Sequence, residues 1–183
     1  VPHPSLAGGR SAPAPVEAMA EWARASAAMT QLEASVATGL PQGLPWSATV
    51  GNHDLCRWDD GTSAGFNTSF GIHPSTGLNH FHGRHYFGGT ADPAALDDNY
   101  ITFSAGGIDF LVVSLRYHGD ANLGGNGTLA PPEAVLAWAD GVLAAHPHHR
   151  AIVVTHHLMG IYNHPSDRTT WSAAGAAIYG RLR

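Results

Sequence analysis

The stretch of sequence that decides the fold is Ile108–Leu115, IDFLVVSL, which is almost continuously apolar. A run of this length and composition predicts a strand at the centre of a sheet, buried on both faces. Residues 99–104, NYITFS, form a second β-rich run and are joined to the first by Ala105-Gly106-Gly107. Because glycine adopts the backbone conformations that tight turns require, we expect the two runs to pair as a hairpin.

A helix and another strand follow the predicted hairpin. Pro131–Ala145 predicts a helix, since proline is tolerated in the first turn, where its missing N–H does no harm. Residues 150–155, RAIVVT, predict a second buried strand, and a last helix is expected after a cap at Thr170 or Ser172. Strand, helix, strand in this order indicates a crossover between parallel strands and a sheet covered by helices. The predicted fold class is therefore α/β.

The N-terminal half predicts one long helix and little other regular structure. Residues 1–15 are rich in proline and are expected to form a loop or arm. Residues 16–37 place apolar side chains at three- and four-residue steps, which predicts an amphipathic helix that Gly39 ends. Residues 47–50 predict a short strand. Residues 55–98 show little periodicity, so we expect a long insertion or lid there.

Composition limits the classes of function. The chain has 183 residues, enough for one domain, and a formal net charge of −5. Its nine basic residues form no stripe of the kind that binds duplexes, so no nucleic-acid partner is expected. No uninterrupted apolar run reaches the ~20 residues of a membrane-spanning helix, so no membrane partner is expected either. The one excess is 13 histidines, the side chain that most often binds metals in proteins.

Polar residues follow two of the predicted strands. Gly51-Asn52-His53-Asp54 comes after Val50, and His156-His157 comes after Thr155. Ligands collect at the carboxyl ends of the strands in sheets covered by helices. Each group alone would also suit an ordinary polar turn, but the residue types fit together chemically. An amide oxygen and an imidazole nitrogen are suitable ligands for Zn²⁺, Mn²⁺ or Fe²⁺.

Within the first group, the three polar residues suit three different tasks. Gly51 would let the backbone turn sharply off the strand, so that Asn52 faces a metal and His53 points toward a substrate. Asp54 is available to hold the His53 imidazole. A carboxylate paired with a histidine favours the imidazolium, which suits a general acid.

These two groups resemble motifs of a known family. Val50–Asp54, VGNHD, resembles the GNH[DE] signature of the calcineurin-like metallophosphoesterases, and residues 152–157, IVVTHH, resemble that family's later strand-then-histidine motif. The resemblance extends over about residues 16–183 and points to a secreted bacterial branch. It implies a metallo-dependent phosphatase-like β-sandwich flanked by helices, and a secreted or periplasmic location.

The resemblance also implies a reaction and roles for four residues. The family hydrolyses phosphate mono- or diesters of small molecules at two divalent metal ions, which are Zn, Mn or Fe. Asn52 and His156 would both bind the second metal, although a shift of one residue would exchange His156 for His157. His53 would protonate the leaving oxygen or hold the phosphate, and Asp54 would orient His53.

The chain departs from the family pattern in its other motifs. The opening Asp-x-His and Gly-Asp motifs do not occur before Asn52, and the closing Gly-His-x-His motif does not occur in the chain. We therefore expect residues 1–183 to form a single partial domain, inactive alone, that lacks both ends of the family fold, or a relative that has lost its metals.

Two other functions remain open. The first is a non-catalytic scaffold of the same family that binds a glycan or a partner protein. The second is an unrelated zinc-binding module built on the histidine-rich residues 73–85, among which Arg84 is also a candidate contact for a substrate phosphate.

Overall fold

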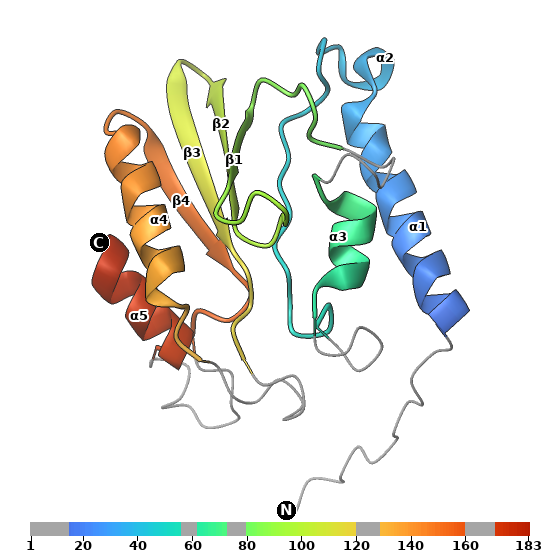
Figure 1. Cartoon of the computed structure of the whole chain (residues 1–183). Coiled ribbons are helices and arrows are strands. Elements are labelled where there is room, and N and C mark those ends of the chain that lie inside the picture. The colour runs from blue at the N-terminus through green and yellow to red at the C-terminus, as the bar shows by residue number, and fades with distance from the viewer. Residues whose placement is uncertain (1–14, 56–61, 73–79, 120–128, 160–170) are drawn as a thin grey trace, which may run out of the picture.

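The structure is a computed structural model that describes residues 15–55, 62–72, 80–119, 129–159 and 171–183 (Figure 1). Cys56, His73 and Thr170, and nearly all of the predicted N-terminal arm, lie outside these described residues. The described residues form five helices and one four-stranded sheet, which confirms the predicted α/β class. The helices are α1 (Pro15–Glu33), α2 (Ser35–Thr38), α3 (Ala64–Phe70), α4 (Glu133–Ala145) and α5 (Ala173–Leu182). The strands are β1 (Phe87–Thr90), β2 (Asn99–Ala105), β3 (Ile108–Leu115) and β4 (Arg150–Thr155).

The sheet has the strand order β1-β2-β3-β4. Strands β2 and β3 form the predicted antiparallel hairpin, and Ala105 pairs with Ile108 across its turn. Gly106 and Gly107 have φ values of 58° and 78°, the left-handed region that a two-residue hairpin turn of type I′ requires. Strand β4 pairs with β3 in parallel after the α4 crossover, as predicted. The carboxyl ends of β3 and β4 therefore lie at the same edge of the sheet as the start of β2.

The sheet separates two apolar clusters (Figure 1). Side chains of β3, including Leu111 and Val113, pack against α4 and α5 on one face. Ile101 of β2 belongs to the cluster on the other face, together with residues of α1, α3 and the segment that precedes Gly51. The buried members of this second cluster outside the sheet include Trp46, Val50, Phe66, Phe70, Phe81 and Tyr117.

Two predictions about the N-terminal half need correction. The helix expected over residues 16–37 breaks at Ala34, whose ψ of 111° is extended, and resumes as the short helix α2. Gly39 then ends α2 at a φ of 71°, as expected. Residues 47–50 form no strand of the sheet, and their contacts with the ends of β2 and β3 include several hydrogen bonds from side chains. Thr49 Oγ1, for example, donates to the Leu115 carbonyl at 2.9 Å.

Residues 55–98, where we expect a long insertion or lid, contain more regular structure than their lack of periodicity indicates. Their described part contains α3 and β1, and Phe66, Phe70 and Phe81 are buried in the core. Edge-to-face contacts join the rings of Phe66 and Phe70 to Trp22 of α1, with centroids 6.2 and 6.0 Å apart. The segment is therefore part of the folded body, and its aromatic side chains provide the apolar face that the sequence periodicity did not reveal.

Strand β4 is not buried as predicted. Ile152 is 45% exposed and Val154 is 36% exposed, and both lie on the face of β4 opposite α4 and α5. The apolar run suggested burial on both faces, but within the described residues β4 pairs only with β3 and is covered on one face. No helix of the described chain is long and apolar enough to cross a membrane.

Candidate active site

The GNHD residues form a compact turn directly after a buried anchor. Val50 is fully buried, and its carbonyl accepts a hydrogen bond from the Tyr117 N–H at 2.8 Å. The chain then turns, so that the Asp54 N–H donates to the Gly51 carbonyl at 3.2 Å. In return the Gly51 N–H donates to Asp54 Oδ2 at 2.7 Å. These two bonds close a loop from which Asn52 and His53 project.

Gly51 is the point where the two predicted motifs meet. A Cβ atom placed on Gly51 would lie 3.3 Å from Asp54 Oδ2 and 3.3 Å from His156 Nδ1. The structure therefore brings His156, at the end of β4, against the turn that holds Asn52 and His53. We expected Gly51 to provide a special backbone angle, but its φ is not positive. Glycine is instead favoured because a Cβ atom would be tightly placed between the side chains of Asp54 and His156.

The two adjacent histidines lie in different environments. His156 is exposed and its ring meets Tyr117 edge-on, with centroids 5.7 Å apart. His157 is only 7% exposed and stacks on Tyr117, with an angle of 13° between the rings. Burial and the charge of His156 lower the pKa of His157, and its Nε2 is buried without a partner in the described structure. His156 is thus the one of the pair that is free to meet a ligand.

The remaining predicted residues are placed as follows. Asn52 is half-buried and His53 is exposed, and neither side chain forms a hydrogen bond to another described residue. The expected contact between Asp54 and His53 is not among the contacts of the described residues, because the Asp54 carboxylate holds the Gly51 amide. Asp54 therefore influences the positions of Asn52 and His53 by closing the turn that carries them, not by a direct contact among the described residues.

Asn52 and His156 supply part of a metal-binding set. Their amide oxygen and imidazole nitrogen are both suitable donors for a divalent cation. A tight zinc site, however, uses three or four ligands. Within the described residues, no group of three or more His, Cys, Asp or Glu side chains is arranged to hold a metal ion. The described residues alone therefore do not complete a metal centre.

In the described part of the histidine-rich segment, His80 and Arg84 are already bonded to other residues. Residues 73–79 lie outside the described residues. His80 is buried and is bonded to both Ser26 and Glu33. The Arg84 guanidinium donates to Glu33 Oε2 at 3.0 Å and to the Gln42 carbonyl at 2.7 Å. The proposed phosphate contact of Arg84 is therefore not supported, because this side chain already links α1 to the following segment.

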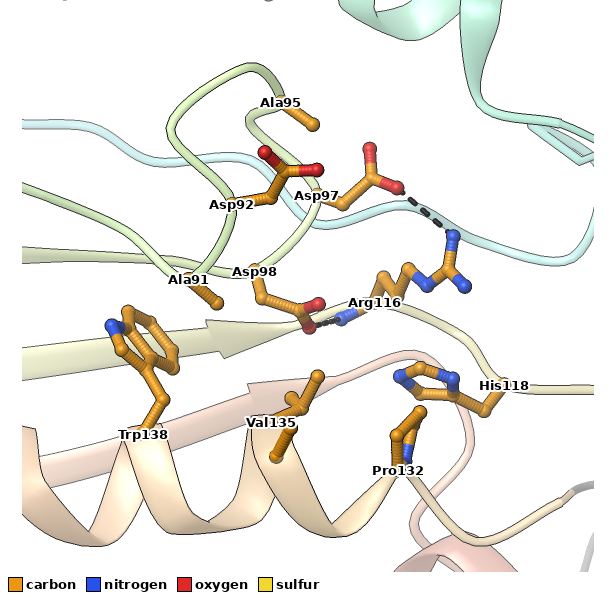
Figure 2. Close-up of a pocket in the computed structure, with 11 residues that line it drawn as sticks. Ala91, Asp92, Ala95, Asp97, Asp98, Arg116, His118, Pro132, Val135 and Trp138 are labelled. Carbon is orange, nitrogen blue, oxygen red and sulfur yellow. Dashed lines mark hydrogen bonds and ion pairs between the residues drawn. The ribbon is translucent and has the colours of Figure 1, made fainter.

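Sequence reasoning missed a group of polar residues at the same edge of the sheet. Figure 2 shows a pocket of about 280 Å³ between the start of β2, the end of β3 and the first turns of α4. Its polar lining comes from Asp92, Asp97, Asp98, Arg116 and His118. The hairpin register could have identified these residues. Asn99 pairs with Ser114, so the acidic residues before β2 must lie beside the residues that follow β3.

The pocket contains two buried groups with shifted pKa values. Asp98 accepts a hydrogen bond from the Arg116 N–H at 2.9 Å, and burial raises the pKa of Asp98 to about 6. Burial and the charge of Arg116 lower the pKa of His118 to about 4, so its ring is neutral at pH 7. The Arg116 guanidinium itself donates to Asp97 Oδ2 at 3.0 Å.

We compared the chain with family models, curated proteins and solved structures, and none of them matches it. The assignment of a function therefore depends on the residues and the geometry described above.

Proposed function

We propose that this chain carries part of the active site of a calcineurin-like metallophosphoesterase, which hydrolyses phosphate mono- or diesters of small molecules. The observation that supports this most directly is the meeting of the GNHD turn and His156 at Gly51. Two motifs that are far apart in the sequence, and that resemble two motifs of one catalytic centre, lie within contact distance of a single point. This point lies at the carboxyl edge of a sheet covered by helices, where ligands usually bind.

In this proposal Asn52 and His156 are ligands of one of two divalent metal ions, Zn, Mn or Fe. When bound, such a pair of ions neutralises charge on the phosphoryl oxygens and lowers the pKa of a bound water. The donor atoms of Asn52 and His156 suit this role, but they are too few for a complete site, so other ligands must come from beyond the described residues.

His53 would serve as the general acid. Its ring is exposed on the turn, where it can hold a proton for the leaving oxygen of a substrate. Asp54 is a positioning residue in this proposal, because its carboxylate closes the turn through the Gly51 N–H. The same hydrogen bond fixes the backbone on which both Asn52 and His53 are carried.

The finer fold and the location belong to the same proposal. The four-stranded sheet would be one layer of a metallophosphatase-like β-sandwich, with the exposed face of β4 turned toward the rest of the domain. A secreted or periplasmic location is proposed from the family resemblance alone.

A metal titration of the chain tests the ligand assignment. Mn²⁺ binding is followed by electron paramagnetic resonance, in which bound ions lose their free-ion signal. We expect weak binding that is lost in Asn52→Ala and in His156→Ala, because each removes one of two ligands. His148→Ala is the matched control, since His148 is exposed in the turn between α4 and β4 and should leave binding unchanged.

Activity is tested on the protein encoded by the whole reading frame, with 4-nitrophenyl phosphate and its diester as substrates. His53→Ala should lower turnover by about 10²–10⁴-fold, the usual contribution of a general acid, while both metals stay bound. Loss of metal in His53→Ala would contradict the assigned roles. Metal-loaded protein with no turnover on either ester would favour the binding scaffold.

A further inference from the structure

The pocket of Figure 2 shares no lining residue with the candidate active site. Arg116 and His118 line it, whereas Tyr117 between them belongs to the apolar cluster on the other side and contacts His156 and His157. A neighbouring pocket is lined by Leu55, Arg116, Tyr117 and His118, so the two sites are close to each other. The inference below uses none of the residues assigned to the candidate active site, and it does not rest on the proposed phosphoesterase activity.

Two buried polar groups in this pocket have unused hydrogen-bonding capacity within the described structure. His118 is only 8% exposed, and its Nε2 has no hydrogen-bond partner in the described structure. Asp98 is 7% exposed, and only one of its carboxylate oxygens is bonded to a described residue, the Arg116 N–H. Leaving a buried polar group unpaired costs free energy, so such groups in a folded protein normally meet a partner.

The charge of the pocket is negative. Arg116 is already neutralised by its ion pair with Asp97, whose carboxylate also accepts hydrogen bonds from Ser63 and Asn67. His118 is neutral at pH 7, because burial lowers its pKa to about 4. The charge of Arg116 also lowers the pKa of Asp98, but neither Asp98 nor Asp92 forms a salt bridge within the described residues. Both carboxylates accept hydrogen bonds when ionised and do not donate them, and the unpartnered Nε2 of the neutral His118 ring accepts one in the tautomer that carries its proton on Nδ1.

The other walls are apolar and the space is small. Pro132, Val135 and Trp138 of the α4 segment face the polar residues across the pocket (Figure 2). The volume of about 280 Å³ is at the lower end of the range for ligand pockets, so it suits a short group. An indole face also attracts cations through the ring quadrupole. A metal ion is a poorer candidate, since no three acidic or histidine side chains of the described residues converge on one point.

We propose that this pocket binds the primary ammonium group of a small alkylamine or aminoalkyl substituent. The ammonium would donate to the buried Asp98 carboxylate and to the unpartnered His118 ring nitrogen, and the exposed Asp92 carboxylate adds negative charge to the pocket. Its alkyl chain packs on Val135 and Trp138. The positive charge balances the Asp98 and Asp92 carboxylates, and the small volume limits the ligand to a short chain.

An NMR titration with n-butylamine tests this site directly. At pH 8 an alkylamine is still protonated, as a lysine side chain is, and Asp98 is ionised. We expect saturable shifts of the Trp138 indole N–H and of the His118 ring nitrogens at millimolar amine. The neutral probe 1-butanol has the same length and should bind at least about tenfold more weakly, because it lacks the charge. Sodium phosphate, which Arg116 would attract if it were free, should cause no shift.

Three substitutions of carboxylates separate the site from general charge effects. Asp98→Asn keeps an oxygen for the Arg116 N–H and should weaken amine binding by about tenfold or more. Asp92 is exposed, and Asp92→Asn keeps an oxygen that can accept the hydrogen bond from the Ala94 N–H. This substitution should therefore weaken amine binding without a risk to folding. Asp109→Asn removes the same charge at the far end of β3 and is the control that should bind like the original chain.

Several results would overturn the proposal. Equal binding of 1-butanol would mean that the pocket recognises only apolar chains. Binding of phosphate would mean that the charge of Arg116 dominates the pocket and that the pocket prefers anions to cations. Undiminished amine binding in both Asp98→Asn and Asp92→Asn, or an equal loss in Asp109→Asn, would show that the ammonium does not meet these carboxylates.

Discussion

At the scale of single residues, Gly51 determines whether the two motifs can meet. The φ angle of Gly51 is not positive, so residues with a side chain can also adopt it. What matters at this position is that glycine has no Cβ atom. A methyl group at this position would lie 3.3 Å from both Asp54 Oδ2 and His156 Nδ1, closer than ordinary van der Waals contact. The side chains of Asp54 and His156 would both have to shift by a few tenths of an ångström, which disturbs the hydrogen bond that closes the turn and the position of the imidazole.

Gly51→Ala is therefore expected to abolish the weak Mn²⁺ binding of the chain and to lower its free energy of unfolding by about 1–2 kcal/mol, the usual cost of overpacking. Urea unfolding and the Mn²⁺ titration measure the two effects. Gly141→Ala is the control, because nothing lies within 4 Å of the added methyl group on α4. It should leave metal binding unchanged and raise stability by up to ~1 kcal/mol, as alanine does in helices. Unaltered metal binding in Gly51→Ala would show that His156 and the turn do not form one site.

At the scale of helices and strands, the elements predicted correctly are those with strong local signals. The Gly106-Gly107 turn, the prolines before α4 and the Ser172 cap are all read directly from the sequence. Ser172 Oγ accepts the Gly175 N–H at 2.9 Å, as an N-cap should. Helix α3 was missed because tertiary contacts stabilise it. The Asn67 side chain, for example, donates to Asp97 Oδ1 at 2.6 Å.

The candidate site was predicted to a similar extent. Asn52, His53 and His156 follow apolar runs, so the rule that ligands bind at strand ends identified them. The pocket residues Asp98 and His118 also flank strands, but their closeness depends on the register of β2 and β3. The burial of the His118 ring lowers its pKa. This burial depends on the packing of α4, and no pattern in the sequence indicates it.

Within the described residues, β4 is an edge strand of the sheet and carries two exposed apolar side chains, Ile152 and Val154. An uncovered strand edge with apolar side chains favours pairing with another chain. We therefore expect the chain to associate at high concentration, and Ile152→Lys to reduce that association, measured by sedimentation velocity over a range of concentrations. Val36→Lys makes the same chemical change at a 98% exposed position on α2 and should not alter association. Equal effects of the two substitutions would mean that general charge, and not the β4 face, controls self-association.

At the scale of the whole molecule, two groups of the Figure 2 pocket link the stability of the fold to pH in opposite directions. The pKa of His118 falls from 6.5 to about 4 on folding, through burial and the charge of Arg116, so its contribution to stability is lost as pH falls through that interval. The pKa of Asp98 rises from 3.8 to about 6, through burial that the Arg116 contacts only partly offset, so its contribution is lost as pH rises through 6. Asp97 acts on both groups with the opposite sign to Arg116.

Between pH 4 and pH 6 the unfolded chain holds one more proton at His118, and the folded chain holds one more proton at Asp98. The two effects cancel in the original protein, and a substitution of either residue reveals the other. Relative to the original chain, His118→Gln should gain stability as pH is lowered from 7 to 4.5, whereas Asp98→Asn should lose it, each by an amount on the order of 2 kcal/mol. Urea unfolding at several pH values measures both changes. A constant packing cost of either substitution does not matter, because only the variation with pH is compared. Parallel pH profiles for all three proteins would show that neither group is buried in the ionisation state described here.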